Sequence, residues 1–268
     1  MYCAECGTEL SGGSRFCPNC GAAVRTWQVP ETTAKTTETH ENDKSIAKFV
    51  SGHTRAQWVT ILLALVIVAS VIWMAFDLSD ISLINKWQGR AYFSWAEATE
   101  AEAHDNRQEA ILVVWVVLSI ATAAAFLVWI YRAHKNLPAL GAKNLQYSPR
   151  WAVGWWFVPI MNLARPFQVV TEIWKASDPE VTDGHSWRNT PLSPLISSWW
   201  TLWILSSIIA WIVMRIAFAS EPTTVTDLLP HRWALFAVSA LEIIAAILAI
   251  LVVRGIDARQ EAKHRRLI

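Results

Sequence analysis

The sequence predicts an all-α polytopic membrane protein with four transmembrane helices and a small separate module at its N-terminus. Hydrophobic residues make up 53% of the chain and charged residues only 17%. The apolar residues gather in long uninterrupted runs, which is typical of membrane proteins and not of soluble cores. All cysteines lie between Met1 and Cys20, so the N-terminal segment differs in character from the rest of the chain.

Each long apolar run has the length of a membrane-spanning helix. The runs cover residues 58–76, 110–130, 195–214 and 233–253. At a rise of about 1.5 Å per residue, about 20 residues cross a hydrocarbon layer of about 30 Å. Residues 56–256 are therefore predicted to form a four-helix transmembrane domain.

The N-terminal segment holds two Cys-x-x-Cys pairs, Cys3 with Cys6 and Cys17 with Cys20, each followed by glycine. Two such turns bring four thiolates onto one tetrahedral ion, and glycine permits the tight turn around the sulfurs. The alternative is two disulfides in a secreted mini-domain, but the repeated spacing favours zinc. Residues 1–25 are thus predicted to be a zinc ribbon that needs a structural Zn²⁺ to fold. The segment resembles the zinc ribbons at the N-termini of many bacterial membrane proteins.

Residues 26–55 are polar and rich in threonine, with no apolar period, which predicts a flexible linker. Within the ribbon, Arg15 and Arg25 are balanced by Glu5 and Glu9. Nucleic-acid binding draws on several basic residues acting together, so this balance argues against it. A cytosolic protein partner is the expected ligand of the ribbon.

Flanking charges predict the orientation. Basic residues precede the first apolar run and follow the second and fourth, whereas the other two loops are mainly acidic. The basic residues are Lys48, Arg55, Arg132, Lys135, Lys143, Arg150, Arg254, Arg259, Lys263, Arg265 and Arg266. The positive-inside rule then places both termini, residues 131–192 and a basic tail at residues 257–268 in the cytoplasm. Thiols stay reduced there, which suits zinc. The resemblance of the ribbon to those of bacterial membrane proteins implies that the membrane is a bacterial plasma membrane.

A tryptophan-rich segment broken by prolines lies between the second and third runs. Its sequence predicts one helix from Pro149 to about Pro159 and a second from Pro166 to about Lys175. Neither is long enough to span a membrane. Residues 148–177 are therefore predicted to form a helical hairpin on the cytoplasmic side, and two geometries stay open: a re-entrant hairpin that dips into the membrane, or one that lies on it.

Polar residues in apolar surroundings define a hypothetical polar membrane site of Asn162, Arg165, Glu172 and Glu242. Asn162 and Arg165 lie at the hairpin turn, where they could satisfy exposed carbonyl groups. Glu242 lies near the middle of the fourth run, where an ionisable residue marks a candidate functional site. We expect it to pair with Arg165, or with Arg215 if the hairpin is shallow. A purely structural role for Glu242 is equally consistent with the sequence.

The same region resembles a known family. The matching run is WIYRAHKNLPALG…SPRWAVGWWFVPIMNLARPFQVVTEIWKAS. It is similar to the signature of domain of unknown function 4328, an uncharacterised bacterial membrane family whose members commonly carry an N-terminal zinc ribbon. The resemblance covers about residues 55–255 and implies no activity. The residues that match the signature are Arg132, Asn136, Trp155, Trp156, Pro159, Asn162, Pro166 and Trp174.

The sequence contains none of the catalytic motifs GxSxG or HExxH and no phosphate-binding glycine loop, so we do not expect an enzyme. His134 is expected to face lipid headgroups. The expected function is that of a non-catalytic sensor or scaffold whose ribbon contacts protein partners. The alternative is a small channel or proton-coupled transporter that uses the Glu242 and Arg165 region.

Small residues on the second and fourth apolar runs permit close helix approach. They serve either contacts within the bundle or a homo-oligomer, and they are Ala121, Ala125, Ala245 and Ala249.

Overall fold

The computed structural model describes residues 8–9, 19–20, 48–88, 95–181, 183–219 and 224–268. The chain divides into two compact units, Met1–Ile46 and Ala47–Ile268. In the described part of the second unit, every regular element is helical, which confirms the predicted all-α class.

Four long helices form the membrane domain. They are α1 (His53–Trp87), α2 (Trp95–Lys135), α5 (Pro194–Ala219) and α6 (Leu229–Leu267). All are long and apolar enough to cross a membrane, as the sequence predicts. They extend beyond the apolar runs at their polar ends. The stretch from Asp77 to Trp87, predicted to be a loop, is instead the last part of α1.

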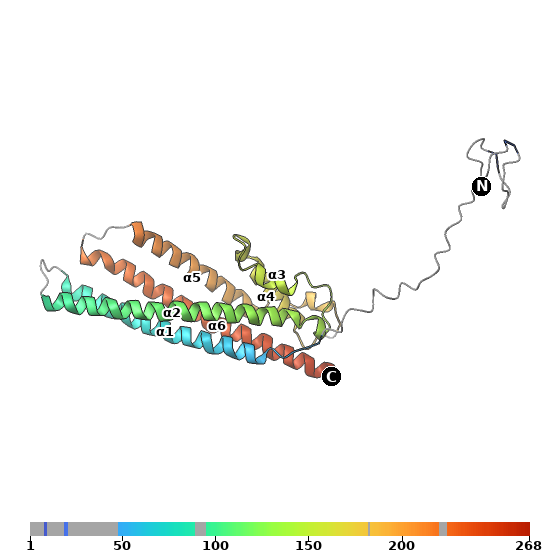
Figure 1. Ribbon diagram of the computed structural model, residues 1–268, viewed down its shortest axis with the longest axis horizontal. Coiled ribbons are helices and arrows are strands. Elements are labelled where there is room, and N and C mark those ends of the chain that lie inside the picture. The colour runs from blue at the N-terminus through green and yellow to red at the C-terminus, as the bar shows by residue number, and fades with distance from the viewer. Residues whose placement is uncertain (1–7, 10–18, 21–47, 89–94, 182, 220–223) are drawn as a thin grey trace. The chain divides into compact units, whose positions relative to one another are not determined.

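The helices are arranged with α6 in the middle. It packs against α1 on one side and α5 on the other, and α2 packs against α1 (Figure 1). We call the end where α1 begins and α6 finishes the terminal end, and the opposite end the loop end. Ala245 and Ala249 of α6 are buried inside this bundle. These two small residues therefore lie within the bundle of a single chain.

The segment between α2 and α5 is built of short elements. They are η1 (Pro138–Leu140), α3 (Pro149–Gly154), η2 (Met161–Leu163), α4 (Arg165–Ala176) and η3 (Ser186–Asn189), and a further short turn, η4 (Val225–Leu228), precedes α6.

The two helices of the hairpin begin where the sequence predicts. The hydroxyl of Ser148 accepts a hydrogen bond from the backbone N–H of Trp151 and so caps α3. However, α3 ends at Gly154 and not near Pro159. The N–H groups of Trp156 and Phe157 bond to carbonyls three residues earlier, so the chain leaves the α-helix there.

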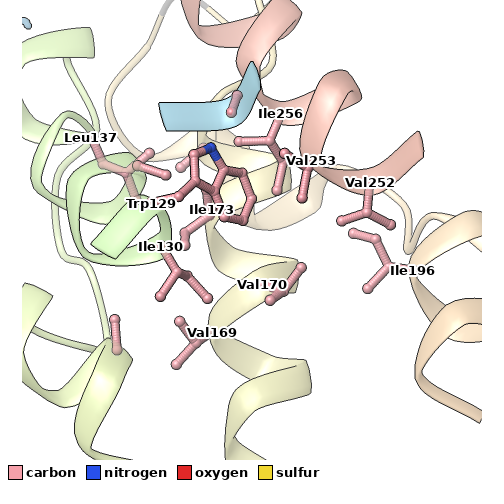
Figure 2. Packing of buried hydrophobic residues seen from close by; sticks show 14 of the residues in the cluster. Trp129, Ile130, Leu137, Val169, Val170, Ile173, Ile196, Val252, Val253 and Ile256 are labelled. Atoms are coloured by element: carbon pink, nitrogen blue, oxygen red, sulfur yellow. The ribbon is translucent and has the colours of Figure 1, made fainter. Parts of the chain in front are cut away.

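The core of the terminal end forms around α4. Figure 2 shows Val169, Val170 and Ile173 of α4 together with Trp129 of α2 and Val253 of α6. All five are at most 1% exposed. Complete burial of this kind contributes about 1.5–3 kcal/mol per large aliphatic side chain. The amphipathic face of α4 is thus what fastens the hairpin to the membrane helices.

The closest approach between α4 and α6 requires a glycine. A Cβ atom at Gly255 would lie 2.7 Å from Cζ3 of Trp174. The Trp174 ring in turn lies 4.2 Å from the Arg259 guanidinium carbon, a cation–π geometry. This contact holds the end of the hairpin against the extension of α6.

Candidate functional site: a polar network and a membrane cavity

A buried histidine–glutamate pair lies where α4 meets the end of α2. Nε2 of His134 is 3.0 Å from Oε1 of Glu172, and both side chains are at most 3% exposed. The Glu172 carboxylate also accepts hydrogen bonds from the backbone N–H groups of Gln146 and Tyr147. Glu172 therefore has partners at both oxygens. His134 does not face lipid headgroups, and that expectation was wrong.

Asn136 and Gln260 join four segments of the chain at the same end. Asn136 donates to the carbonyl of Val50 and to Oε1 of Gln260, and its own side-chain oxygen accepts from the Val50 N–H. Gln260 donates to the carbonyl of Ala133 and to the Ser177 hydroxyl. These bonds connect the start of the membrane unit with the ends of α2, α4 and α6.

Further bonds tie the C-terminal part of α6 to the end of α4. Nζ of the buried Lys263 donates to the carbonyl of Ala176 at 2.9 Å. Arg259 lies 3.1 Å from the carboxylate of Asp178. We call the whole set centred on Glu172, His134, Asn136, Gln260 and Lys263 the terminal-end network. Buried polar groups that are paired in this way hold elements in register.

The hairpin turn is held differently from the expectation. Arg165 donates to the Tyr147 hydroxyl and to Oε1 of Gln168, and its guanidinium lies over the ring of Trp155. Asn162 makes no side-chain hydrogen bond to the described residues. The turn carbonyl of Leu163 is instead satisfied by the indole N–H of Trp200 from α5. Nothing in the structure supports a pair between Arg165 and Glu242.

The tip of the hairpin exposes large apolar side chains. Phe157, Ile160 and Leu163 are 71%, 76% and 54% exposed. Ile160 has a positive φ of 65°, a left-handed conformation that is costly for a β-branched residue. Exposure of these apolar side chains to water costs free energy, whereas their exposure to lipid does not.

A cavity of about 470 Å³ lies inside the membrane domain, where all four long helices and the hairpin meet. Its lining is mainly aromatic and aliphatic. The lining residues come from α1 (Leu63, Val66), α2 (Trp115, Ser119, Thr122, Ala123, Phe126, Leu127), the hairpin (Trp156, Phe157), α5 (Trp199, Trp203, Ser206, Ser207) and α6 (Glu242, Ala245, Ala246, Ala249). We call it the Glu242 cavity.

Glu242 is the ionisable residue of this cavity. Within the part of the chain that the structure describes, its carboxylate has no hydrogen bond or ion pair. Arg215, the second expected partner, is exposed and lies beside the Trp211 ring. The sequence-based site is therefore divided: Glu172 belongs to the terminal-end network, Asn162 and Arg165 to the hairpin turn, and Glu242 to the cavity.

A second polar cluster lies at the loop end. Arg232 of α6 is 2.9 Å from Asp80 and 3.8 Å from Asp77, both on α1. Gln108 of α2 donates to Asp80. These residues connect three helices, and their pairing could not be predicted while Asp77 and Asp80 were assigned to a loop.

Little of the N-terminal unit is described. Asn19 donates a hydrogen bond from its side-chain amide to the Thr8 hydroxyl at 3.1 Å, which joins the segments next to the two cysteine pairs. Cys20 is exposed. The other predicted ligands, Cys3, Cys6 and Cys17, lie outside the described residues. Four thiols in two Cys-x-x-Cys turns form a donor set that fits a tetrahedral Zn²⁺.

Sequence reasoning missed the partners of Glu172 and the role of Gln260. A histidine at the predicted end of a membrane helix gives no sign of burial, and Gln260 lies in what was predicted to be a basic tail. The one available signal was that His134, Asn136 and Glu172 fall within the family-like run. That signal does not say which of them touch.

Comparisons with known proteins agree with the architecture. A zinc-ribbon domain matches residues 2–24, which suggests zinc binding. A search of curated proteins and a search of solved structures each returned no match. The model of DUF4328, a domain of unknown function, matches residues 94–258. The chain is thus a multi-pass membrane protein that belongs to the DUF4328 family and carries an N-terminal zinc ribbon.

Proposed function

We propose that this protein is a non-catalytic membrane sensor or scaffold, in which the Glu242 cavity binds a small molecule and the zinc ribbon contacts a cytosolic protein. One observation carries the proposal: a mainly apolar cavity of about 470 Å³ contains a carboxylate with no partner among the described residues. Cavities of this size with few polar groups are typical ligand sites. An unpaired carboxylate inside a membrane is costly and is kept where it serves a function.

The hairpin could transmit a movement at the cavity toward the N-terminal unit, through a chain of hydrogen bonds. Trp156 and Phe157 line the cavity, and α4 continues from the same hairpin to Ser177. Ser177 accepts from Gln260, and Gln260 accepts from Asn136, which also holds the backbone of Val50. A ligand that moved the hairpin would therefore disturb the backbone at Val50, near the end of the predicted linker. The hairpin itself is proposed to enter the membrane on the cytoplasmic side, since its tip is apolar and exposed.

The proposed orientation has both termini in the cytoplasm of a bacterial cell. It can be tested with single cysteines introduced into a background in which the four native cysteines are serines. A cysteine at exposed Thr224, at the loop end, should react in intact cells with a membrane-impermeant maleimide. A cysteine at exposed Glu180, at the terminal end, should react only after the cells are opened. The reverse pattern would overturn the orientation.

Partner contact can be tested by photo-crosslinking in cells. A photoreactive amino acid at exposed Glu9 should capture a defined protein, and the same group at Glu180 serves as the matched control. Capture should disappear when Cys3 and Cys6 are replaced by serine, because the ribbon then loses its metal. Capture should also change with Ala246→Trp, which fills the cavity. Absence of any Glu9-specific product would contradict the partner role.

A proton-coupled transporter is the second candidate, and the unpaired Glu242 is the observation that favours it. Proton uptake by liposomes that contain the protein would be compared between wild type and Glu242→Gln. Uptake that depends on Glu242 would replace the sensor with the transporter. Equal background uptake by both proteins supports the sensor.

A further inference from the structure

The Glu242 carboxylate and three hydroxyl oxygens of the cavity are acceptors, while the lining also includes the Ser119 hydroxyl and four tryptophans, whose indole N–H groups are donors. Its described lining includes one carboxylate and no lysine, arginine or histidine. The hydroxyl groups of Thr122, Ser206 and Ser207 donate their protons to backbone carbonyls of their own helices, at Leu118 and Trp203. Their oxygens remain able to accept. The cavity therefore offers negative charge and hydrogen-bond acceptors to a ligand, and this favours a positively charged one.

Aromatic rings surround the same space. Six of the lining residues are aromatic: Trp115, Phe126, Trp156, Phe157, Trp199 and Trp203. The Trp156 ring lies edge-on to Phe126 at 5.3 Å and to Trp203 at 5.9 Å between ring centroids. Tryptophan faces attract organic cations, and the attraction grows when water is excluded. An aromatic wall beside a lone carboxylate is complementary to a cation with an apolar body.

The position of Glu242 decides the route by which such a ligand arrives. Glu242 lies about 14 Å and about 17 Å along the helix from the two ends of its apolar run, at 1.5 Å per residue. The lining residues Ala123 of α2 and Ser207 of α5 are exposed, so the cavity is not closed off beside them. Surface of that kind faces lipid in a membrane, so access is lateral, from the bilayer. A strongly hydrated ion would not use this path, whereas a lipid-soluble cation would.

We infer that the Glu242 cavity is a binding site for lipophilic organic cations, with Glu242 as the counter-ion and the tryptophans as the apolar wall. This inference rests on the proposed function, because it names the chemical class of the ligand that the cavity takes. It requires one molecule bound per chain.

The probe is tetraphenylphosphonium, and its control is tetraphenylborate, which has the same shape and the opposite charge. Equilibrium binding of each would be measured on the full-length protein in lipid nanodiscs, with empty nanodiscs to subtract partition into lipid. Wild type should bind tetraphenylphosphonium saturably at one site, and tetraphenylborate should show partition only.

Three variants locate the site. Glu242→Gln keeps the shape of the side chain and removes its charge, so tetraphenylphosphonium should bind about tenfold more weakly or not at all. Glu242→Asp restores the charge and should recover part of the affinity, which a purely structural role would not predict. Glu180→Gln removes an exposed carboxylate far from the cavity lining and should leave binding unchanged. Elution as a single monodisperse species is required of each variant.

The outcomes separate the inference from the function on which it rests. No saturable tetraphenylphosphonium binding by wild type, or equal binding by Glu242→Gln, overturns the cation inference. If neutral triphenylphosphine oxide binds instead, and Ala246→Trp blocks it, the cavity is a ligand site of another class and the sensor proposal stands. If no probe binds and ribbon crosslinking is insensitive to Ala246→Trp, both fail.

Discussion

Glu172 of the terminal-end network is buried and paired, whereas Glu242 of the cavity is half-buried and unpaired among the described residues. Glu172 has a histidine and two backbone N–H groups as partners, although it lies in apolar sequence. Glu242 also lies in apolar sequence, yet no described group pairs with its carboxylate. In the sequence alone, both residues are acidic groups among hydrophobic neighbours. Their difference arises only from what the fold brings to each.

The contrast separates a structural role from a candidate binding role. A buried charge that is fully paired contributes to a unique arrangement of helices, and its loss leaves several groups without partners. A buried charge without a partner contributes nothing of this kind to stability. In a cavity, such a group marks a candidate binding site, and we propose that a ligand binds at Glu242. The following predictions test this division, from the largest expected effect to the smallest.

Replacing Glu172 by alanine should have the largest effect. His134 and the N–H groups of Gln146 and Tyr147 would lose their acceptor, and the free energy of unfolding should fall by about 3–5 kcal/mol. Thermal unfolding in detergent measures the loss as a lower Tm. The control is Glu180→Ala, which removes only an exposed pair with Arg266 and should cost at most about 1 kcal/mol. Equal effects of the two changes would contradict a structural role for Glu172.

Asn136→Ala should have an intermediate effect. This change removes the bonds that Asn136 makes to Val50 and Gln260 and leaves Oε1 of the buried Gln260 without its donor, at a cost of about 2–3 kcal/mol. Since Asn136 holds the backbone of Val50, near the end of the predicted linker, amide hydrogen exchange should also increase around residue 50. An unchanged exchange rate there would show that Asn136 does not hold this segment.

Lys263→Met should have the smallest effect among these. Lys263 makes a single hydrogen bond, to the carbonyl of Ala176, and methionine retains most of its apolar contacts. Because an isolated buried ammonium pays a desolvation cost, its replacement should change the free energy of unfolding by about 1 kcal/mol or less. A loss as large as that of Glu172→Ala would mean that Lys263 is part of a stronger ion pair.

Much of the fold could be predicted from the sequence, because a sufficiently long apolar run indicates a membrane-spanning helix. The four spans and the start of each hairpin helix agree with the structure. The end of α3 does not, since three-residue hydrogen bonding after Gly154 leaves no mark in composition. Nor could the ends of the long helices be placed, because polar residues such as Asp77 continue a helix when a partner like Arg232 lies nearby.

The candidate site was only partly predictable. Glu242 stands out because a charge at the middle of an apolar run is unusual whatever surrounds it. The pairing of Glu172 with His134 depends on how α4 folds back onto α2. No local sequence pattern predicts this packing. The expected pair of Arg165 with Glu242 failed because Arg165 finds nearer acceptors, Tyr147 and Gln168.

The most direct test of the division compares one conservative change at both glutamates. Glu172→Gln and Glu242→Gln each keep the size of the side chain and remove one negative charge. Tm would be measured for both variants and for wild type in the same detergent, with no added ligand. Glu172→Gln should lower Tm, because it removes the charge that pairs with His134. Glu242→Gln should leave Tm unchanged or raise it, because no partner is lost and a desolvated charge disappears. A loss of Tm at Glu242→Gln as large as at Glu172→Gln would contradict the account, since it would show that Glu242 holds a partner within the fold.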